Sequence, residues 1–409
     1  MAWMRRRSAA IGGLAASVLV LACSEGEART SVTPTTTGED DTTGSITTFQ
    51  PTSIDPTDPT LTTSGSEDET GTGTTGATSI EPDSDGGSTA GTSEGSSSGS
   101  VDEPPSVQST TPAELMSGVA ADTTIEVTFS EVMDPATVTT TVGTGCTGAL
   151  QVSSDGFTTC VAMTGVPSTG DDQTFVVTPA EPLDSATTYQ IRVLATVTDV
   201  GGTPMDADFT TVTGFIVRYF HTIDIDGTDD FNMDEILSSS TPGHTARVAW
   251  DDSYLYLGFD SPAVGGDPEE WMVVYIGGPA GTSQGVMYNT QLPTMPFDAR
   301  WHLRWRLDGT FWGALEWTGA AWQDAAFTIP AADVIMMGSF VELRVPWADI
   351  GDPAYLDLHL GLLNEQDFGE WSWAAVPDTS YGDGYDPAYS HFLQFDRFGS
   401  TLPANVLPM

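Results

Sequence analysis

The chain has 409 residues and a formal net charge of −45, with 57 acidic residues against 12 basic ones. All the basic residues are arginine, and so acidic a chain cannot neutralise the phosphates of DNA or RNA, which excludes nucleic acid as a partner. The same charge opposes direct binding to anionic lipid heads, so membrane association must have another source.

The first 22 residues have the pattern of an export signal. Residues 5–7 are arginines, and residues 11–21 form an apolar run that is too short to span a membrane. The run ends in Val-Leu-Ala-Cys at Cys23, which resembles a bacterial lipobox. That resemblance implies cleavage before Cys23 and acylation of its thiol. The alternative is an ordinary secretory signal that happens to contain a cysteine.

Residues 23–104 have the composition of a disordered tether. They are mostly Ser, Thr, Gly, Asp, Glu and Pro, so they cannot bury enough apolar surface to offset chain entropy. A random coil of this length, about 80 residues, spans roughly 50 Å. Ser24 and Glu25 follow the cysteine, without the aspartate that signals retention in the inner membrane. We therefore expect lipid-anchored display at the outer membrane or cell surface.

Amino-acid usage divides the remainder into residues 105–214 and 215–409. All five histidines and every tryptophan beyond the signal lie in the second segment. Cys146 and Cys160 both lie in the first. An even pair in an exported chain, with no histidine nearby, predicts a disulfide rather than a metal pair or reactive thiols.

Segment 105–214 has the alternation of a small β-sandwich. Strands are predicted at residues 125–129, 150–152, 157–161, 174–178 and 189–193. Ser154-Asp155-Gly156 is a hairpin signal between the second and third of these.

Four stretches of this segment carry a family resemblance. They are residues 105–112, 125–135, 183–189 and 197–202. Together they resemble a bacterial Ig-like domain of the surface-layer SbsA type. The resemblance implies a spacer or adhesion module without catalysis.

Segment 215–409 is also rich in β patterns. Strands are predicted at residues 247–250, 254–259, 271–276, 341–345, 356–363 and 391–395. The clearest hairpin spans residues 300–318 and turns at Asp308-Gly309-Thr310. In that register one face is apolar and belongs to the core; it carries Trp301, Leu303, Trp305, Leu307, Phe311, Gly313, Leu315 and Trp317. The opposite face carries Arg300, His302, Arg304, Arg306, Trp312, Ala314, Glu316 and Thr318.

This polar face has two interpretations. It is either a solvated sheet face that pairs with the domain's own carboxylates, or a platform that binds a polar ligand. Arginine forks suit paired sugar hydroxyls or a carboxylate, and Trp312 would stack on a sugar ring. Trp271, Trp322 and Trp371 lie beside polar residues or glycine, so we expect them to be exposed as well.

The second segment resembles carbohydrate-binding module family nine and its DOMON-like relatives. The resembling stretches are residues 225–231, 248–256, 341–350, 362–364, 371–373 and 392–395. The resemblance implies a jelly-roll β-sandwich in which two aromatic rings enclose a terminal sugar. Trp371 and Asn364 match its site best. Arg304 or Arg306 would supply the base, and Trp271 or Trp312 the second ring. Glu316 lies on the predicted polar face and completes the candidate set.

One interpretation of the acidic loops is a structural Ca²⁺ site. No cofactor is expected. Asp224, Asp226 and Asp229 form the candidate site, although their spacing is not that of an EF-hand. Asp134 and Asp199 of the first segment offer a second one, for which turn capping is the alternative.

The sequence thus predicts an all-β, non-catalytic, lipid-anchored surface protein that presents a glycan-binding sandwich on an Ig-like spacer. The alternatives are a structural or adhesive surface protein without a sugar ligand, and a glycoside hydrolase. Carboxylate pairs occur in any acidic chain, so they do not favour the hydrolase. The oligomeric state is not indicated.

Replacement of Cys23 by alanine should convert the protein from membrane-associated to soluble, because the acylated thiol is the predicted anchor. Detergent phase partitioning of the expressed variant measures this. A variant that still enters the detergent phase would contradict the lipid anchor.

Overall fold

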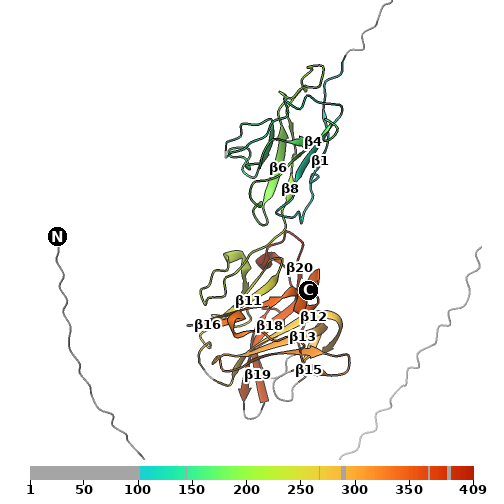
Figure 1. The fold of residues 1–409 in the computed structure, drawn as a ribbon. Helices are drawn as coiled ribbons and strands as arrows, with labels where there is room; N and C mark the ends of the chain where they lie inside the picture. The colour runs from blue at the N-terminus through green and yellow to red at the C-terminus, as the bar shows by residue number, and fades with distance from the viewer. Residues whose placement is uncertain (1–101, 144, 267, 287–291, 367–368, 385–387) are drawn as a thin grey trace, which may run out of the picture. The chain divides into compact units, whose positions relative to one another are not determined.

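The computed structural model describes residues 102–409 except 144, 267, 287–291, 367–368 and 385–387 (Figure 1). The predicted signal, Cys23 and residues 23–101 of the predicted tether lie outside the described residues. The described chain is all-β, as the sequence predicted. Its helical segments are four 3₁₀ turns, η1 Met233–Glu235, η2 Ala331–Asp333, η3 Trp347–Ile350 and η4 Pro403–Asn405. Among these residues no helix has the length and apolarity needed to cross a bilayer.

The first sandwich consists of two four-stranded antiparallel sheets. Its strands are β1 Val107–Thr111, β2 Ile125–Phe129, β3 Leu150–Ser153, β4 Ser168–Thr169, β5 Thr174–Val177, β6 Thr188–Val193, β7 Phe209–Thr210 and β8 Phe215–Ile216. One sheet has the order β1-β2-β5-β4, and the other has β3-β6-β7 with β8 also paired to β6. The strand β8 extends this sandwich past residue 214, where the sequence placed the boundary.

Alternating apolar residues build the core of the first sandwich. Ile125, Val127 and Phe129 of β2 are fully buried, while the residues between them are partly exposed. Tyr189 and Ile191 of β6 are buried in the same way. The period of two in the sequence therefore marks which side of each strand faces the core.

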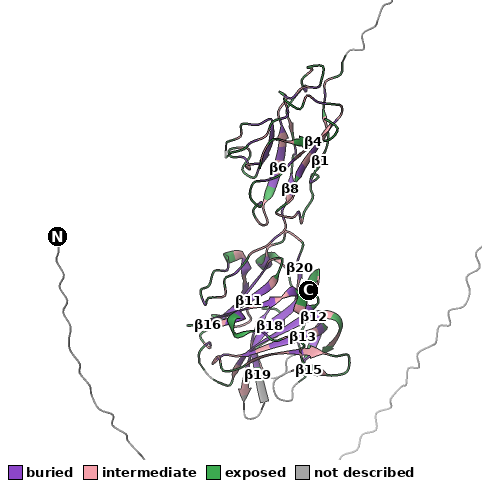
Figure 2. Cartoon of the chain, in the orientation of Figure 1, coloured by how far each residue is buried: buried purple, intermediate pink, exposed green. Residues whose placement is uncertain are grey.

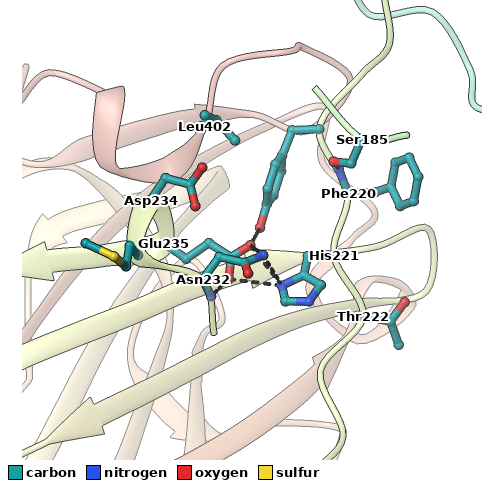
Figure 3. A pocket seen from close by; sticks show the side chains of 10 residues that line it. Ser185, Phe220, His221, Thr222, Asn232, Asp234, Glu235 and Leu402 are labelled. Carbon is teal, nitrogen blue, oxygen red and sulfur yellow. Dashed lines mark hydrogen bonds and ion pairs between the residues drawn. The ribbon is translucent and has the colours of Figure 1, made fainter. Parts of the chain in front are cut away.

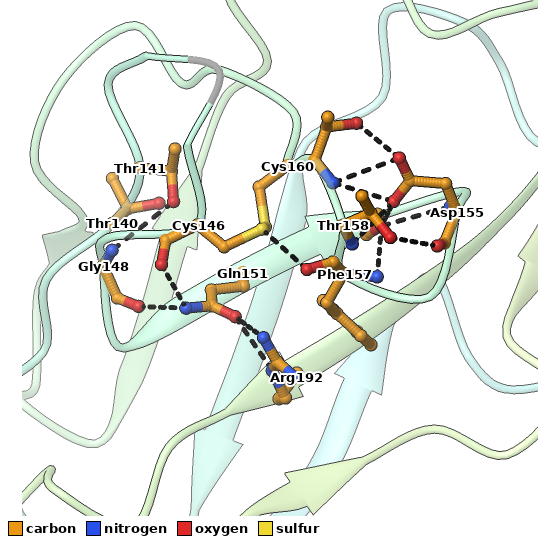
Figure 4. Close-up of a disulfide and its surroundings, with 12 residues drawn as sticks. Thr140, Thr141, Cys146, Gly148, Gln151, Asp155, Phe157, Thr158, Cys160 and Arg192 are labelled. Carbon is orange, nitrogen blue, oxygen red and sulfur yellow. Dashed lines mark hydrogen bonds between the residues drawn. A yellow bond between two sulfur atoms is a disulfide. The ribbon is translucent and has the colours of Figure 1, made fainter.

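The region after β3 differs from the predicted hairpin. The strand β3 pairs with β6, and residues 157–161 form an irregular turn (Figure 4). Asp155 organises the turn, because its carboxylate accepts the Thr159 N–H at 2.9 Å and the Thr159 hydroxyl at 2.6 Å. These groups then need no strand partner. The turn brings Cys160 to Cys146, and the two residues form the disulfide expected from the sequence.

The second sandwich packs a five-stranded sheet against a seven-stranded sheet. The smaller sheet contains β9 Ile236–Ser238, β10 Thr245–Trp250, β11 Tyr254–Asp260, β16 Val334–Met337 and β17 Phe340–Pro346. The larger sheet contains β12 Glu270–Gln284, β13 Thr294–Arg306, β14 Trp312–Trp317, β15 Trp322–Asp324, β18 Tyr355–Gln366, β19 Gly369–Val376 and β20 Leu393–Asp396. The orders are β16-β17-β11-β10-β9 and β15-β14-β13-β12-β18-β19, with β20 paired to β18.

Large aromatic residues fill the space between these sheets. Figure 2 shows buried segments on the central strands of this sandwich. Trp250 and Trp347 are both buried to 98%. Each buried indole N–H has a partner: Trp250 donates to the Arg397 carbonyl at 3.1 Å, and Trp347 to the Asp251 carbonyl at 2.8 Å. The rings therefore contribute apolar area without leaving a donor unsatisfied.

The other face of the seven-stranded sheet is largely covered as well, and this differs from the solvated face considered above. Tyr275, His302 and His359 lie side by side on β12, β13 and β18 and are fully buried. Tyr389 covers His359, with ring centroids 3.9 Å apart. Burial lowers the pKa of both histidines to about 3, and the nearby Arg304 charge adds to this for His302. Both imidazoles are therefore neutral at physiological pH.

The hairpin of β13 and β14 forms, but its register is one residue from the predicted one. Trp301 pairs with Glu316 and Trp305 with Trp312. The loop contains four residues, because the Arg306 N–H bonds to the Phe311 carbonyl at 2.9 Å. A shift of one residue exchanges the faces of a strand. The prediction that Trp312 and Glu316 share a face with Arg304 is therefore wrong.

Replacement of Cys146 and Cys160 by serine should lower the free energy of unfolding of the first sandwich by about 3 kcal/mol, because the bond closes a loop of about 15 residues. Urea unfolding followed by far-UV circular dichroism measures this. Tryptophan fluorescence is the control, since residues 105–214 contain no tryptophan. An equal shift of the fluorescence transition would contradict the assignment.

Candidate functional site

Four side chains on the outer side of the seven-stranded sheet form what we call the arginine face: Arg304, Arg306, Trp271 and Phe311. Trp271 lies opposite Arg306 in the β12–β13 ladder, and the Arg306 guanidinium lies 5.7 Å from its ring. Phe311 contacts Trp271 edge to face, with centroids 5.6 Å apart, and its ring lies 5.6 Å from the Arg304 guanidinium. The face thus joins two cations to two aromatic rings.

Arg304 differs from every other arginine in the described part of the chain. Six of the eight described arginines lie within 4.0 Å of a carboxylate oxygen, and Arg192 donates to the Gln151 side chain at 2.8 Å. The Arg304 side chain makes no hydrogen bond or ion pair with any described residue, and its Nε is buried without a partner. A guanidinium is left without an acceptor in a chain where acceptors are abundant.

A different part of the sheet holds the two residues that matched the family site best. Trp371 on β19 lies directly opposite Asn364 on β18, and Trp371 is 43% exposed. These two residues point to the core side of the sheet, because their neighbours Leu363 and Ser372 point to the outer side with Trp271. We call this pair the rim pair.

The structure therefore divides the predicted site residues among three places. Arg304, Arg306 and Trp271 lie on the arginine face, and Trp371 and Asn364 form the rim pair. Trp312 and Glu316 are in the third place, on the core side of β14. Trp312 donates its indole N–H to the Ile329 carbonyl, and Glu316 accepts from Arg300 at 2.6 Å.

Two of the exposure assignments change as a result. Trp271 is only 3% exposed, because Phe311 and Arg306 cover its ring, so the expectation that it is exposed is wrong. Phe311 was assigned to the core face, and the one-residue shift turns it outward, where it is 42% exposed. Gly313 lies two residues further along on the same side and has no side chain. The apolar pattern of this strand therefore does not distinguish the predicted register from the observed one.

A cavity of about 590 Å³ contains a second polar cluster, which the sequence did not predict (Figure 3). Glu235, fully buried, accepts from the Tyr219 hydroxyl at 2.6 Å, from His221 Nδ1 at 2.9 Å and from the Asn232 N–H at 2.7 Å. The available signal was the Asn-x-x-Glu spacing, which is typical of a capping box.

The hydrogen bonds of this cluster move two pKa values. The hydrogen bond that His221 donates to Glu235 raises the pKa of His221 above 6.5 despite its partial burial. Burial raises the pKa of Glu235, but the bonds from His221, Tyr219 and Asn232 outweigh it, so the net pKa lies below 4.5. In the described residues no serine, threonine or cysteine side chain bonds to His221. The cluster is thus an ion pair that holds the fold, without a nucleophile for covalent chemistry.

The candidate Ca²⁺ loop is organised by other contacts. Asp229 accepts from Arg247 at 2.9 Å, and buried Glu342 accepts the backbone N–H groups of Asp226 and Gly227. In the described part of the chain, the carboxylate oxygens of Asp224, Asp226 and Asp229 do not all lie within 4.8 Å of one another, as a shared cation would require.

The acidic set that does gather lies in the first sandwich and consists of Asp102, Glu131 and Asp199. Thr203 connects two of its members, because its N–H donates to Asp199 at 2.8 Å and its hydroxyl to Asp102 at 2.8 Å. Asp134 accepts the Ala136 N–H, which is a turn-capping contact.

Residues 101–214 match the family model of the bacterial Ig-like domain, which agrees with the resemblance of that segment. No curated protein matches the chain.

Two solved structures share weak similarity with the chain. The N-terminal part of the bacterial S-layer protein SbsC is 15% identical, with 49% of this chain and 40% of that chain covered and a TM-score of 0.22. The S-layer protein rSbsC(31-844) is 11% identical, with 63% and 39% covered and a TM-score of 0.21. The chain thus spans well under half of either SbsC chain. At these TM-scores the similarity supports no further conclusion.

The pair of His221 and Glu235 should stabilise the second sandwich most between about pH 4.5 and 6.5. The raised pKa of His221 gives stability that is fully present below pH 6.5 and lost as pH rises through the folded pKa. The lowered pKa of Glu235 gives stability that is present above pH 4.5 and lost as pH falls through the folded pKa. His221→Gln keeps a hydrogen-bond donor and removes the charge, so its loss in free energy of unfolding should be greatest in this window.

Urea unfolding followed by tryptophan fluorescence measures this loss, with His391→Gln as a control without a carboxylate partner. A deficit that is constant from pH 4 to 9 would refute the ion pair.

Proposed function

We propose that this chain is a non-catalytic, lipid-anchored surface protein whose Ig-like domain is a spacer and whose second sandwich binds a glycan at the arginine face. The match of residues 101–214 to bacterial Ig-like domains supports a role at the cell surface. The Cys23 motif and the long polar segment after it support anchoring and display away from the membrane.

The observation that carries the glycan proposal is the exposed ring of Phe311 beside the unpaired guanidinium of Arg304. Sugars present apolar C–H faces and ring hydroxyls together, so they are bound by an aromatic platform with hydrogen-bond donors at its edge. Phe311 is the exposed ring of this face, at 42%, and one such ring suits one or two sugar rings. Each ring contact contributes about 1 kcal/mol, so a weak dissociation constant, on the order of micromolar to millimolar, is expected.

The rim pair is the second candidate surface for the same ligand class. Trp371 is as exposed as Phe311, and Asn364 beside it offers both a donor and an acceptor. The two surfaces lie on opposite sides of the sheet, so one sugar ring cannot contact both. Separate variants therefore distinguish them.

A glycan array probed with the full chain should identify a ligand, and Phe311→Ala should weaken its binding about fivefold or more, because the platform is lost. Phe398→Ala is a matched control, since Phe398 is 46% exposed at a distant position. Calorimetry with the array ligand measures the affinities, and circular dichroism checks the fold.

Three results separate the alternatives in this experiment. Loss of binding in Trp371→Ala, with Phe311→Ala unchanged, would move the site to the rim pair. A chain without any ligand on a broad array would favour a purely structural or adhesive protein. Release of reducing sugar from an array ligand would indicate a glycoside hydrolase.

A further inference from the structure

The Arg304 side chain brings hydrogen-bond donors to this face, and no described residue offers it an acceptor. Its two neighbours across the ladder on the same face are Val273 and Gly313, neither of which has a polar side chain. Gly313 has no side chain, so it adds no polar group beside Arg304 Nε, from which a Cβ at that position would lie 3.8 Å. Arg304 itself has five N–H donors and no acceptor.

Two nearby carboxylates that could neutralise Arg304 pair with other arginines. Glu316 pairs with Arg300 on the core side of the same hairpin, at 2.6 Å. Asp308 lies 3.7 Å from Arg306, which also donates to the Pro268 carbonyl. Within the described residues no carboxylate oxygen is within ion-pairing distance of Arg304.

This donor-only character discriminates between classes of sugar. A neutral sugar hydroxyl both donates and accepts, so it would leave its own proton without a partner at Arg304. A carboxylate or sulfate group only accepts, and it matches the planar fork of a guanidinium with two parallel bonds. An anionic group would therefore satisfy Arg304 where a hydroxyl would do so only in part.

We propose that the arginine face recognises an acidic saccharide, with the carboxylate or sulfate of the sugar on Arg304 and the sugar ring against Phe311. The inference rests on the proposed glycan-binding function and names its ligand class. Arg306 is the second, weaker contact, because part of its hydrogen-bonding capacity is already used.

The charge of the chain limits which acidic saccharides fit. A net charge of −45 repels polyanions at long range, and this repulsion is screened beyond about 10 Å at 0.1 M salt. A sugar with one charge near its terminus gains the local contact with Arg304 and meets little of that repulsion. A densely sulfated polymer meets all of it.

The test compares methyl β-D-glucuronide with methyl β-D-glucoside on the full chain, by calorimetry or saturation-transfer NMR. The two differ only in the carboxylate, and a glucose 6-sulfate arm adds the second anionic group. The acidic sugars should bind about tenfold or more tightly than the neutral one, as one charge-assisted bidentate contact provides. Arg304→Gln should remove that preference, and Arg304→Lys should restore part of it. Arg300→Gln, on the same strand but facing Glu316, should leave it intact.

The outcomes separate this inference from the function on which it rests. Equal binding of neutral and acidic sugars, or a preference unchanged in Arg304→Gln, would overturn the acidic ligand and leave glycan binding standing. Binding of acetate or inorganic sulfate as tightly as the acidic sugars would reduce the face to a simple anion site. Absence of binding by every saccharide, with the chain folded, would overturn both proposals.

Discussion

The loop between β13 and β14 determines which side chains meet on each side of the seven-stranded sheet. Leu307, the first of its four residues, is completely buried, so the core holds the start of the turn in place. Gly309 supplies the left-handed conformation, at φ 74°, that the turn requires. A slip of one residue would send Phe311 into the core and bring Trp312 out beside Arg304. The composition of the arginine face therefore depends on this turn rather than on the strands themselves.

The described arginines of this acidic chain differ in whether they hold the fold together. Arg247 on Asp229 and Arg397 on Asp352 tie loops to the second sandwich, and both are more than nine-tenths buried. Arg304 ties no described segment to the fold. Holding a partly buried guanidinium without a hydrogen-bond partner costs stability. Local features that reduce stability without a compensating contact are characteristic of functional sites.

The strands could be predicted from the sequence because their apolar period is local. Residues 125–129, 189–193 and 254–259 each lie within an observed strand. The hairpin predicted at residues 154–156 does not form, because the Asp155 side chain binds Thr159 in place of a strand partner, which the local pattern does not reveal. The burial of Trp271 likewise depends on Phe311, forty residues away in the sequence. Pattern analysis found the three arginines of β13 but not which of them would be left unpaired, because pairing depends on carboxylates from other strands and loops.

The neutrality of the neighbouring histidines completes the electrostatic picture of the arginine face. His302 lies two residues before Arg304 on the same side of β13, and burial together with the Arg304 charge keeps its pKa near 3. Of the four side chains that form the arginine face, Arg304 and Arg306 carry the charge, and the Asp308 carboxylate lies 3.7 Å from Arg306. The acidic sugar that we propose as the ligand would be held by the Arg304 guanidinium, while the net charge of −45 would disfavour polyanionic ligands.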